Sequence, residues 1–195
     1  MLDYIVNKTS HKMASYLKWN ELELAKFYLG MKVLIHDVVM IIGIALLSYK
    51  IGTFEESCII FIAFGFLRLK AGGYHCKESW QCFFCTSFIV IGGALFARHM
   101  HGINVGKVII TYLVLCVIAS LIAPQGTKIR PIALDIKKKM KWETEIILIG
   151  YMFASVLLGE TIGNLLLIAA VFEIVSLIPL IIINFCNYSA EQDFR

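Results

Sequence analysis

The sequence predicts an all-α integral membrane protein, and three observations lead to that fold class. Hydrophobic residues make up 59% of the 195 positions and charged residues only 16%, too few to cover a water-facing surface. The mean hydropathy is +0.78. Long apolar runs alternate with polar loops, and a bilayer-spanning helix needs about 20 apolar residues. A soluble two-domain enzyme is therefore excluded.

The first predicted element covers residues 1–32, where lysines and glutamates are interleaved with apolar side chains. That spacing places one apolar and one charged side on a helix. We expect an amphipathic helix that lies along the membrane interface before the first span.

Six transmembrane helices follow, and together they form a predicted bundle over residues 33–185. The second and fifth spans are short. A C-terminal tail over 186–195 completes a single membrane domain of residues 1–195. The predicted spans are 33–49, 57–69, 81–98, 105–123, 144–159 and 162–185.

The distribution of basic residues predicts the orientation in the membrane. Of 18 lysines and arginines, 15 fall in the N-terminal segment, the 68–80 loop, the 124–143 loop and the C-terminus, and three fall on the other side. Basic residues favour the cytoplasmic side, so we expect a multi-pass plasma-membrane protein with both termini in the cytoplasm. The net charge of +4 is too small to indicate nucleic-acid binding.

The loop between the second and third spans carries the candidate chemistry. If His75 and Cys82 shared one continuous helix, seven residues would separate them by about 10 Å, beyond hydrogen-bond reach. A functional pair therefore requires a break between them. Ser79 precedes the apolar run and is a good helix N-cap, so the break is predicted there.

With Ser79 as the cap, Cys82 lies in the first turn of the third span. The amide groups and dipole of a helix start, together with a neighbouring imidazolium, stabilise a thiolate. Gly72 and Gly73 would let the loop fold back over the helix end. Cys82 is thus the candidate nucleophile and His75 its base.

This segment resembles the signature of the accessory gene regulator B (AgrB) family, membrane cysteine peptidases that process quorum-sensing peptide precursors in Gram-positive bacteria. The residues that carry the resemblance are Arg68, Gly72, Gly73, Tyr74, His75 and Cys82, with Ala123-Pro124 and the following basic stretch. The resemblance implies six spans, cytoplasmic ends, an AgrD-like precursor as partner, contact with membrane lipid and a homodimer. No cofactor, metal or nucleic acid is expected.

Other interpretations of this segment stay open. Its glycines form a turn in any case, and Arg68 and Lys70 are also typical lipid-headgroup anchors. A zinc site built from His75, Cys76, Cys82 and Cys85 is the chemical rival, although the spacing matches no standard zinc pattern. We expect Cys85, one turn deeper than Cys82, to be a packing residue.

Several ionisable residues lie outside this segment. Asp37 and Glu173 lie within predicted spans, where ionisable groups are costly and often functional. Either carboxylate is a candidate to orient His75 or contact substrate. For Glu173 we favour a neutral side chain or one paired with a neighbour such as Asn164, and for Asp37 both interpretations stay open. His99 and His101 fall on the opposite side of the membrane and receive no catalytic role.

The leading hypothesis is a membrane-embedded cysteine endopeptidase that removes the C-terminal tail of a small precursor through a thioester on Cys82. From the resemblance, cyclisation to a thiolactone or lactone follows. The supporting residues are Arg68, Gly72, Gly73, Ser79, Lys137, Lys138 and Lys139, the lysines also acting as headgroup anchors. The alternatives are a small-solute or peptide transporter or channel without proteolytic activity, and a non-catalytic partner of a sensor kinase.

Overall fold

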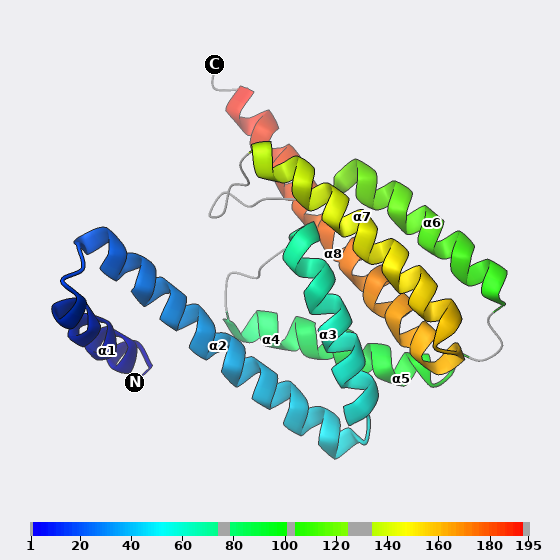
Figure 1. The fold of residues 1–195 in the computed structure, drawn as a ribbon, viewed down its shortest axis with the longest axis horizontal. Helices are drawn as coiled ribbons and strands as arrows, with labels where there is room; N and C mark the ends of the chain where they lie inside the picture. Colours follow the sequence, from blue (N-terminus) through cyan, green and yellow to red (C-terminus); the bar gives the residue numbers. More distant parts are fainter. Residues whose placement is uncertain (1, 74–78, 101–103, 125–133, 193–195) are drawn as a thin grey trace. The chain divides into compact units, whose positions relative to one another are not determined.

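The computed structural model describes residues 2–73, 79–100, 104–124 and 134–192, and within these ranges every regular element is a helix (Figure 1). Side chains at positions 2–5, 11, 14, 79, 134, 135 and 180–192 lie outside that description. The chain divides into two compact units, Met1–Leu47 and Ser48–Arg195.

The N-terminal unit differs from the prediction of one interfacial helix over residues 1–32. It contains α1 (Leu2–Leu17) and the first part of α2 (Glu21–Ile51). The break follows from a capping box, in which the backbone N–H of Glu23 donates to Asn20 Oδ1 at 2.8 Å. In return, the backbone N–H of Asn20 donates to the Glu23 carboxylate at 2.9 Å. This reciprocal pair starts a new helix, so a prediction from apolar spacing alone was wrong here.

Four helices are long and apolar enough to cross a membrane, and they indicate a membrane protein. These segments are Glu21–Ile51, Trp80–Ala97, Val105–Ile122 and Glu160–Pro179. The predicted second and fifth spans correspond to α3 (Phe54–Ala71) and α7 (Leu134–Leu157). Charged residues at the ends of α3 and along the first half of α7 shorten their apolar stretches, so their membrane crossing stays a prediction.

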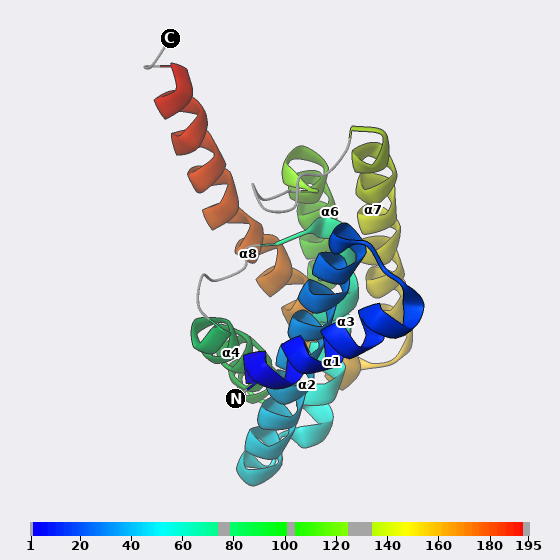
Figure 2. The same cartoon turned by 90° about the vertical axis from the view of Figure 1, so that its left-hand side faces the viewer.

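The C-terminal unit is built around α6 (Val105–Ile122), α7 and α8 (Glu160–Gln192), with α3 packed against α7 and α8. Figures 1 and 2 both show α6 alongside α7. α7 runs antiparallel to α6 and α8 (Figure 1). The shared core is contributed by these four helices and includes Leu67, Ala71, Tyr112, Leu115, Leu148, Leu167, Ala170, Ile174 and Leu177.

The predicted third span is a run of three consecutive helices: α4 (Ser79–Ser87), the π-helix η1 (Phe88–Gly92) and α5 (Gly93–Ala97). η1 and α5 pack against α3 and α8. Gly93 permits this approach, because a Cβ atom there would lie 3.0 Å from Ile168 Cγ2 and 3.3 Å from Ile60 Cδ1. α8 continues to Gln192, so the tail predicted over 186–195 is helical for most of its length.

Candidate active site

The C-terminal end of α3 begins the candidate site. α3 ends at Ala71 because Gly72 takes a positive φ of 81°, and the Gly72 N–H donates to the Arg68 carbonyl at 3.1 Å. Glycine reaches this left-handed conformation without a steric penalty and so closes the helix. The turn that the sequence placed before His75 is therefore present, while His75 itself lies outside the described residues.

Arg68 and Glu173 form an ion pair between α3 and α8. Arg68 Nη1 lies 3.6 Å from Glu173 Oε2; the arginine side chain is 22% exposed and the glutamate side chain is fully buried. The guanidinium also lies over the Phe64 ring, 5.4 Å from its centroid. A buried carboxylate requires a counter-charge, and Arg68 supplies it.

This pair gives Glu173 a different neighbour from the one expected. Asn164, its proposed neighbour, instead donates to the Met100 carbonyl at 2.8 Å. Ser176 contributes a weak contact to Glu173 Oε2 at 3.4 Å. The transporter alternative needed Glu173 on a solute path, and a fully buried carboxylate paired with Arg68 does not favour that role.

Gly73 lies directly against the Arg68 guanidinium. A Cβ atom at position 73 would approach Arg68 Cζ and Nη1 to 2.9 Å and Nη2 to 3.3 Å. A side chain there would require the guanidinium, the flexible end of Arg68, to shift. The two glycines thus have different functions: Gly72 ends the helix, and Gly73 accommodates Arg68.

Cys82 occupies the first turn of α4. The helix begins at Ser79, within one residue of the predicted cap, which makes Cys82 its fourth residue, and the thiol is half-buried. The break that the sequence analysis places between positions 75 and 82 falls on residues 74–78, which lie outside the described residues, and so it stays a prediction. The distance between His75 and Cys82 stays a prediction, since His75 is not among the described residues.

The other sulfur ligands bear on the zinc alternative. Cys85, expected to be packed, is exposed on α4. No group of three or more His, Cys, Asp or Glu side chains gathers as a metal site in the described part of the chain. His75 and Cys76, two of the four ligands of that alternative, lie outside it.

The basic segment of α7 is held near the end of α3 by a second ion pair. Lys70 Nζ lies 2.8 Å from Glu143 Oε2. The hydrogen bond from Lys70, followed by the charges of Lys70 and Lys139, holds the pKa of Glu143 below its usual value. One to two turns before Glu143 on the same helix are three exposed lysines, Lys137, Lys138 and Lys139.

Two further polar groups were considered in the sequence analysis. Asp37 is exposed and lies midway along α2, in the N-terminal unit, and its role at the site stays a prediction. His99 Nδ1 lies 2.9 Å from the Leu95 carbonyl oxygen of its own helical segment.

The opposite end of the C-terminal unit contains an ion pair that the sequence analysis missed. Arg98 donates to Glu56 Oε1 at 2.7 and 2.9 Å and to the Gly52 carbonyl at 2.6 Å. The Arg68–Glu173 pair was missed as well. A signal existed for both, because a charged residue within an apolar helix needs a partner of opposite charge, but the sequence does not say which.

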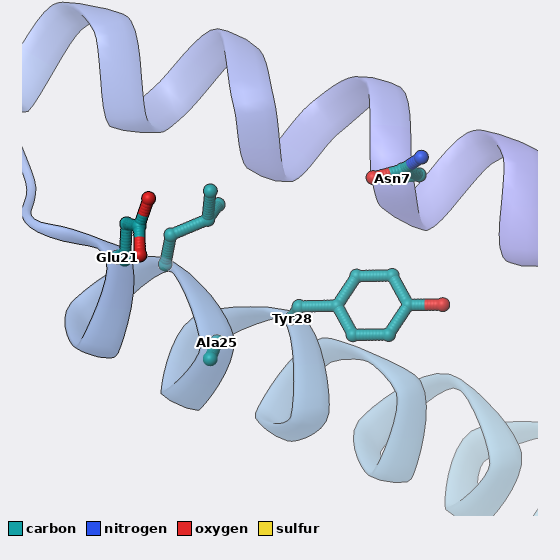
Figure 3. Close-up of a pocket in the computed structure, with 5 residues that line it drawn as sticks. Asn7, Glu21, Ala25 and Tyr28 are labelled. Carbon is teal, nitrogen blue, oxygen red and sulfur yellow. The ribbon is translucent and has the colours of Figure 1, made fainter.

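Cys82 lines neither of two cavities formed by the described residues. A groove of about 310 Å³ in the N-terminal unit is lined by Asn7, Glu21, Leu24, Ala25 and Tyr28, with Asn7 on α1 facing the others on α2 (Figure 3). A cavity of about 230 Å³ at the Arg98 end is lined mainly by Glu56, Arg98, Glu160 and Asn164.

Comparison with known proteins gives one consistent result. The model of a family described as accessory gene regulator B matches residues 6–177. An AgrB-like protein of Clostridium acetobutylicum is 26% identical over 183 residues, covering 92% of this chain and 87% of the relative. Accessory gene regulator protein B of Staphylococcus aureus strain Newman is 26% identical over 187 residues, 94% of this chain and 98% of the relative. Protein FsrB of Enterococcus faecalis is 24% identical over 182 residues, 92% of this chain and 72% of the relative. No solved structure matches.

Proposed function

Because the chain belongs to the accessory gene regulator B family, we propose that it is a membrane-embedded cysteine endopeptidase of quorum-sensing peptide processing. Its substrate is a small AgrD-like precursor. The observation that carries the proposal is the start of α4 at Ser79, which puts Cys82 in the first turn of a membrane helix directly after the Arg68–Gly73 turn and the segment that contains His75.

The chemistry begins with proton transfer from Cys82 to His75. The Cys82 sulfur attacks the carbonyl carbon of the scissile peptide bond, and the C–N bond breaks. The imidazolium returns its proton to the leaving amine, and the C-terminal tail departs. The N-terminal part stays on Cys82 as a thioester.

Ring closure follows from this thioester. A thiol or hydroxyl within the peptide attacks the same carbonyl carbon and displaces the Cys82 sulfur, giving a thiolactone or lactone. Attack by water would instead hydrolyse the thioester to a linear peptide with a free carboxylate, which can no longer cyclise in this way. A nucleophile at the membrane boundary limits the access of water, which favours cyclisation over hydrolysis.

Other residues have supporting roles in this proposal. The exposed lysines 137–139 attract the acidic tail of the precursor and anchor the chain to anionic headgroups. Ser79 starts the helix whose dipole stabilises the thiolate. Six spans with both termini in the cytoplasm, and assembly as a homodimer, belong to the same proposal.

The test uses a synthetic peptide with an amphipathic leader, a central cysteine and an acidic tail, referred to as the precursor probe. Cys82→Ala and Cys82→Ser are expected to abolish tail release in liposomes, whereas Cys85→Ala, one turn away, largely preserves it. A covalent adduct with the precursor probe, lost on treatment with hydroxylamine, would support the thioester. Tail release that survives Cys82→Ala but not Cys85→Ala contradicts the assignment of the nucleophile.

A further inference from the structure

We propose that Glu173 is a positioning residue for the cleavage reaction, acting through Arg68 on the Gly72–Gly73 turn. This inference rests on the proposed function and deepens it. Glu173 belongs to α8, about 90 positions from Cys82, and the ion pair joins it to Arg68, just before the turn that leads towards His75.

The Arg68 guanidinium is confined between Glu173 and the Phe64 ring. Glu173 Oε2 lies 3.6 Å from Nη1, and the Phe64 ring lies 5.4 Å from Cζ. Arg68 belongs to the last turn of α3, and its backbone carbonyl accepts the N–H of Gly72. The Arg68 backbone therefore hydrogen-bonds to the turn, and its side chain contacts α8.

Gly73 lies next to this guanidinium. A Cβ atom at position 73 would come within 2.9 Å of the Arg68 guanidinium, so the Gly73 backbone packs closely against it. The ion pair with Glu173 in turn positions this guanidinium. His75 follows two residues later, and two residues span at most about 7 Å. Gly73 is the last described residue before His75, so its position bounds where the chain towards the imidazole can continue.

A contribution to stability does not by itself explain the Arg68–Glu173 pair. Glu173 is fully buried, and its Oε1 has no hydrogen-bond partner among the described residues. A buried acceptor without a partner is costly, and replacing a buried ion pair by apolar side chains of similar size is often neutral or stabilising. A role in placing the turn explains why a charge is present at this position.

The experiment compares variants of the full-length protein in liposomes with the precursor probe. Glu173→Gln keeps the volume and removes the charge, and we expect kcat for tail release to fall by about tenfold or more with KM within about twofold, as for a misplaced catalytic group. Alkylation of Cys82 by iodoacetamide at neutral pH, followed by mass spectrometry, is expected to slow as well, because a displaced imidazole no longer activates the thiol.

The matched control is the Lys70–Glu143 ion pair. It also involves a residue at the C-terminal end of α3, but it joins α3 to α7 and not to α8. Lys70→Gln and Glu143→Gln are expected to leave kcat and Cys82 alkylation close to wild type. The double variant Arg68→Met with Glu173→Leu distinguishes a positioning role of Glu173 from a purely structural one. This variant is expected to keep the wild-type Tm or exceed it while remaining as slow as Glu173→Gln.

Three results overturn the inference. One is wild-type kcat in Glu173→Gln, and another is wild-type kcat in the folded Arg68→Met/Glu173→Leu variant. The third is a lower kcat with unchanged Cys82 alkylation. Failure of the proposed function is recognised separately, by tail release that survives Cys82→Ala. If Cys82→Ala is inactive and Glu173→Gln is fully active, only the positioning role is lost.

Discussion

Lys70 Nζ lies 2.8 Å from Glu143 Oε2, and this contact joins the C-terminal end of α3 to the basic half of α7. The two side chains are 41% and 30% exposed, so solvent screens the pair and its contribution to stability is small. The pair is one of the contacts between α3 and α7 within the C-terminal unit.

Stability is expected to depend on pH through Glu143. The pKa of this carboxyl is lowered in the folded protein, chiefly by the hydrogen bond from Lys70. The stabilisation is therefore present above the usual glutamate range of about pH 4 and disappears as the pH falls through the lowered value. Glu143→Gln should lower Tm slightly at neutral pH, and the difference from wild type should close in acid. A difference that grows in acid would contradict this assignment.

Binding of the precursor probe is expected to depend on the lysines of α7. Replacing Lys137, Lys138 and Lys139 by Gln removes the charge that attracts an acidic tail, so KM should rise several-fold while kcat stays unchanged. The effect should shrink with added salt, because exposed charges are screened. Lys107→Gln, an exposed lysine at the start of α6, is the control. Equal effects of the two changes would argue against a specific contact with the tail.

Tyr112 supplies a test of the packing between α6 and α7. Ser155 donates to the Gly163 carbonyl at 3.3 Å, so the buried Tyr112 hydroxyl is the donor in its 3.0 Å contact with Ser155. Tyr112→Phe is expected to cost about 1 kcal/mol of unfolding free energy. Combined with Ser155→Ala, the loss should be smaller than the sum of the single losses. Strict additivity, measured by denaturation in detergent, would mean that the hydrogen bond contributes nothing.

Two helical glycines make a matched pair for the α7–α8 connection. A Cβ atom at Gly163 would lie 2.6 Å from the Ser155 carbonyl oxygen, whereas one at Gly150 would meet nothing within 4 Å. Backbone atoms cannot easily move aside, so Gly163→Ala is expected to destabilise by about 1–3 kcal/mol. Gly150→Ala should stabilise by about 0.5–1 kcal/mol, as alanine does in a helix interior. Similar Tm values for both variants would refute the close contact.

Much of the helical arrangement follows from local sequence. Apolar runs of sufficient length form helices, and the first described residue of α4 is Ser79, the position at which the sequence predicts the helix start. Where the prediction failed, a stronger local signal was overlooked. The Asn20–Glu23 capping box divides the helix expected over residues 1–32. At the other end, α8 runs on to Gln192, because the polar residues after 185 include none that stops a helix.

The sequence by itself determined the apolar character of the protein, its helices and the residues of its motif, since these depend on composition and on neighbours along the chain. Only the tertiary structure decided that Glu173 belongs with Arg68 and that Gly73 rests against the guanidinium. Partner choice between residues about 100 positions apart depends on how α3 and α8 pack. Residue spacing along the chain does not identify the partner. A charge in an apolar helix shows that a counter-charge is needed but does not show which residue supplies it.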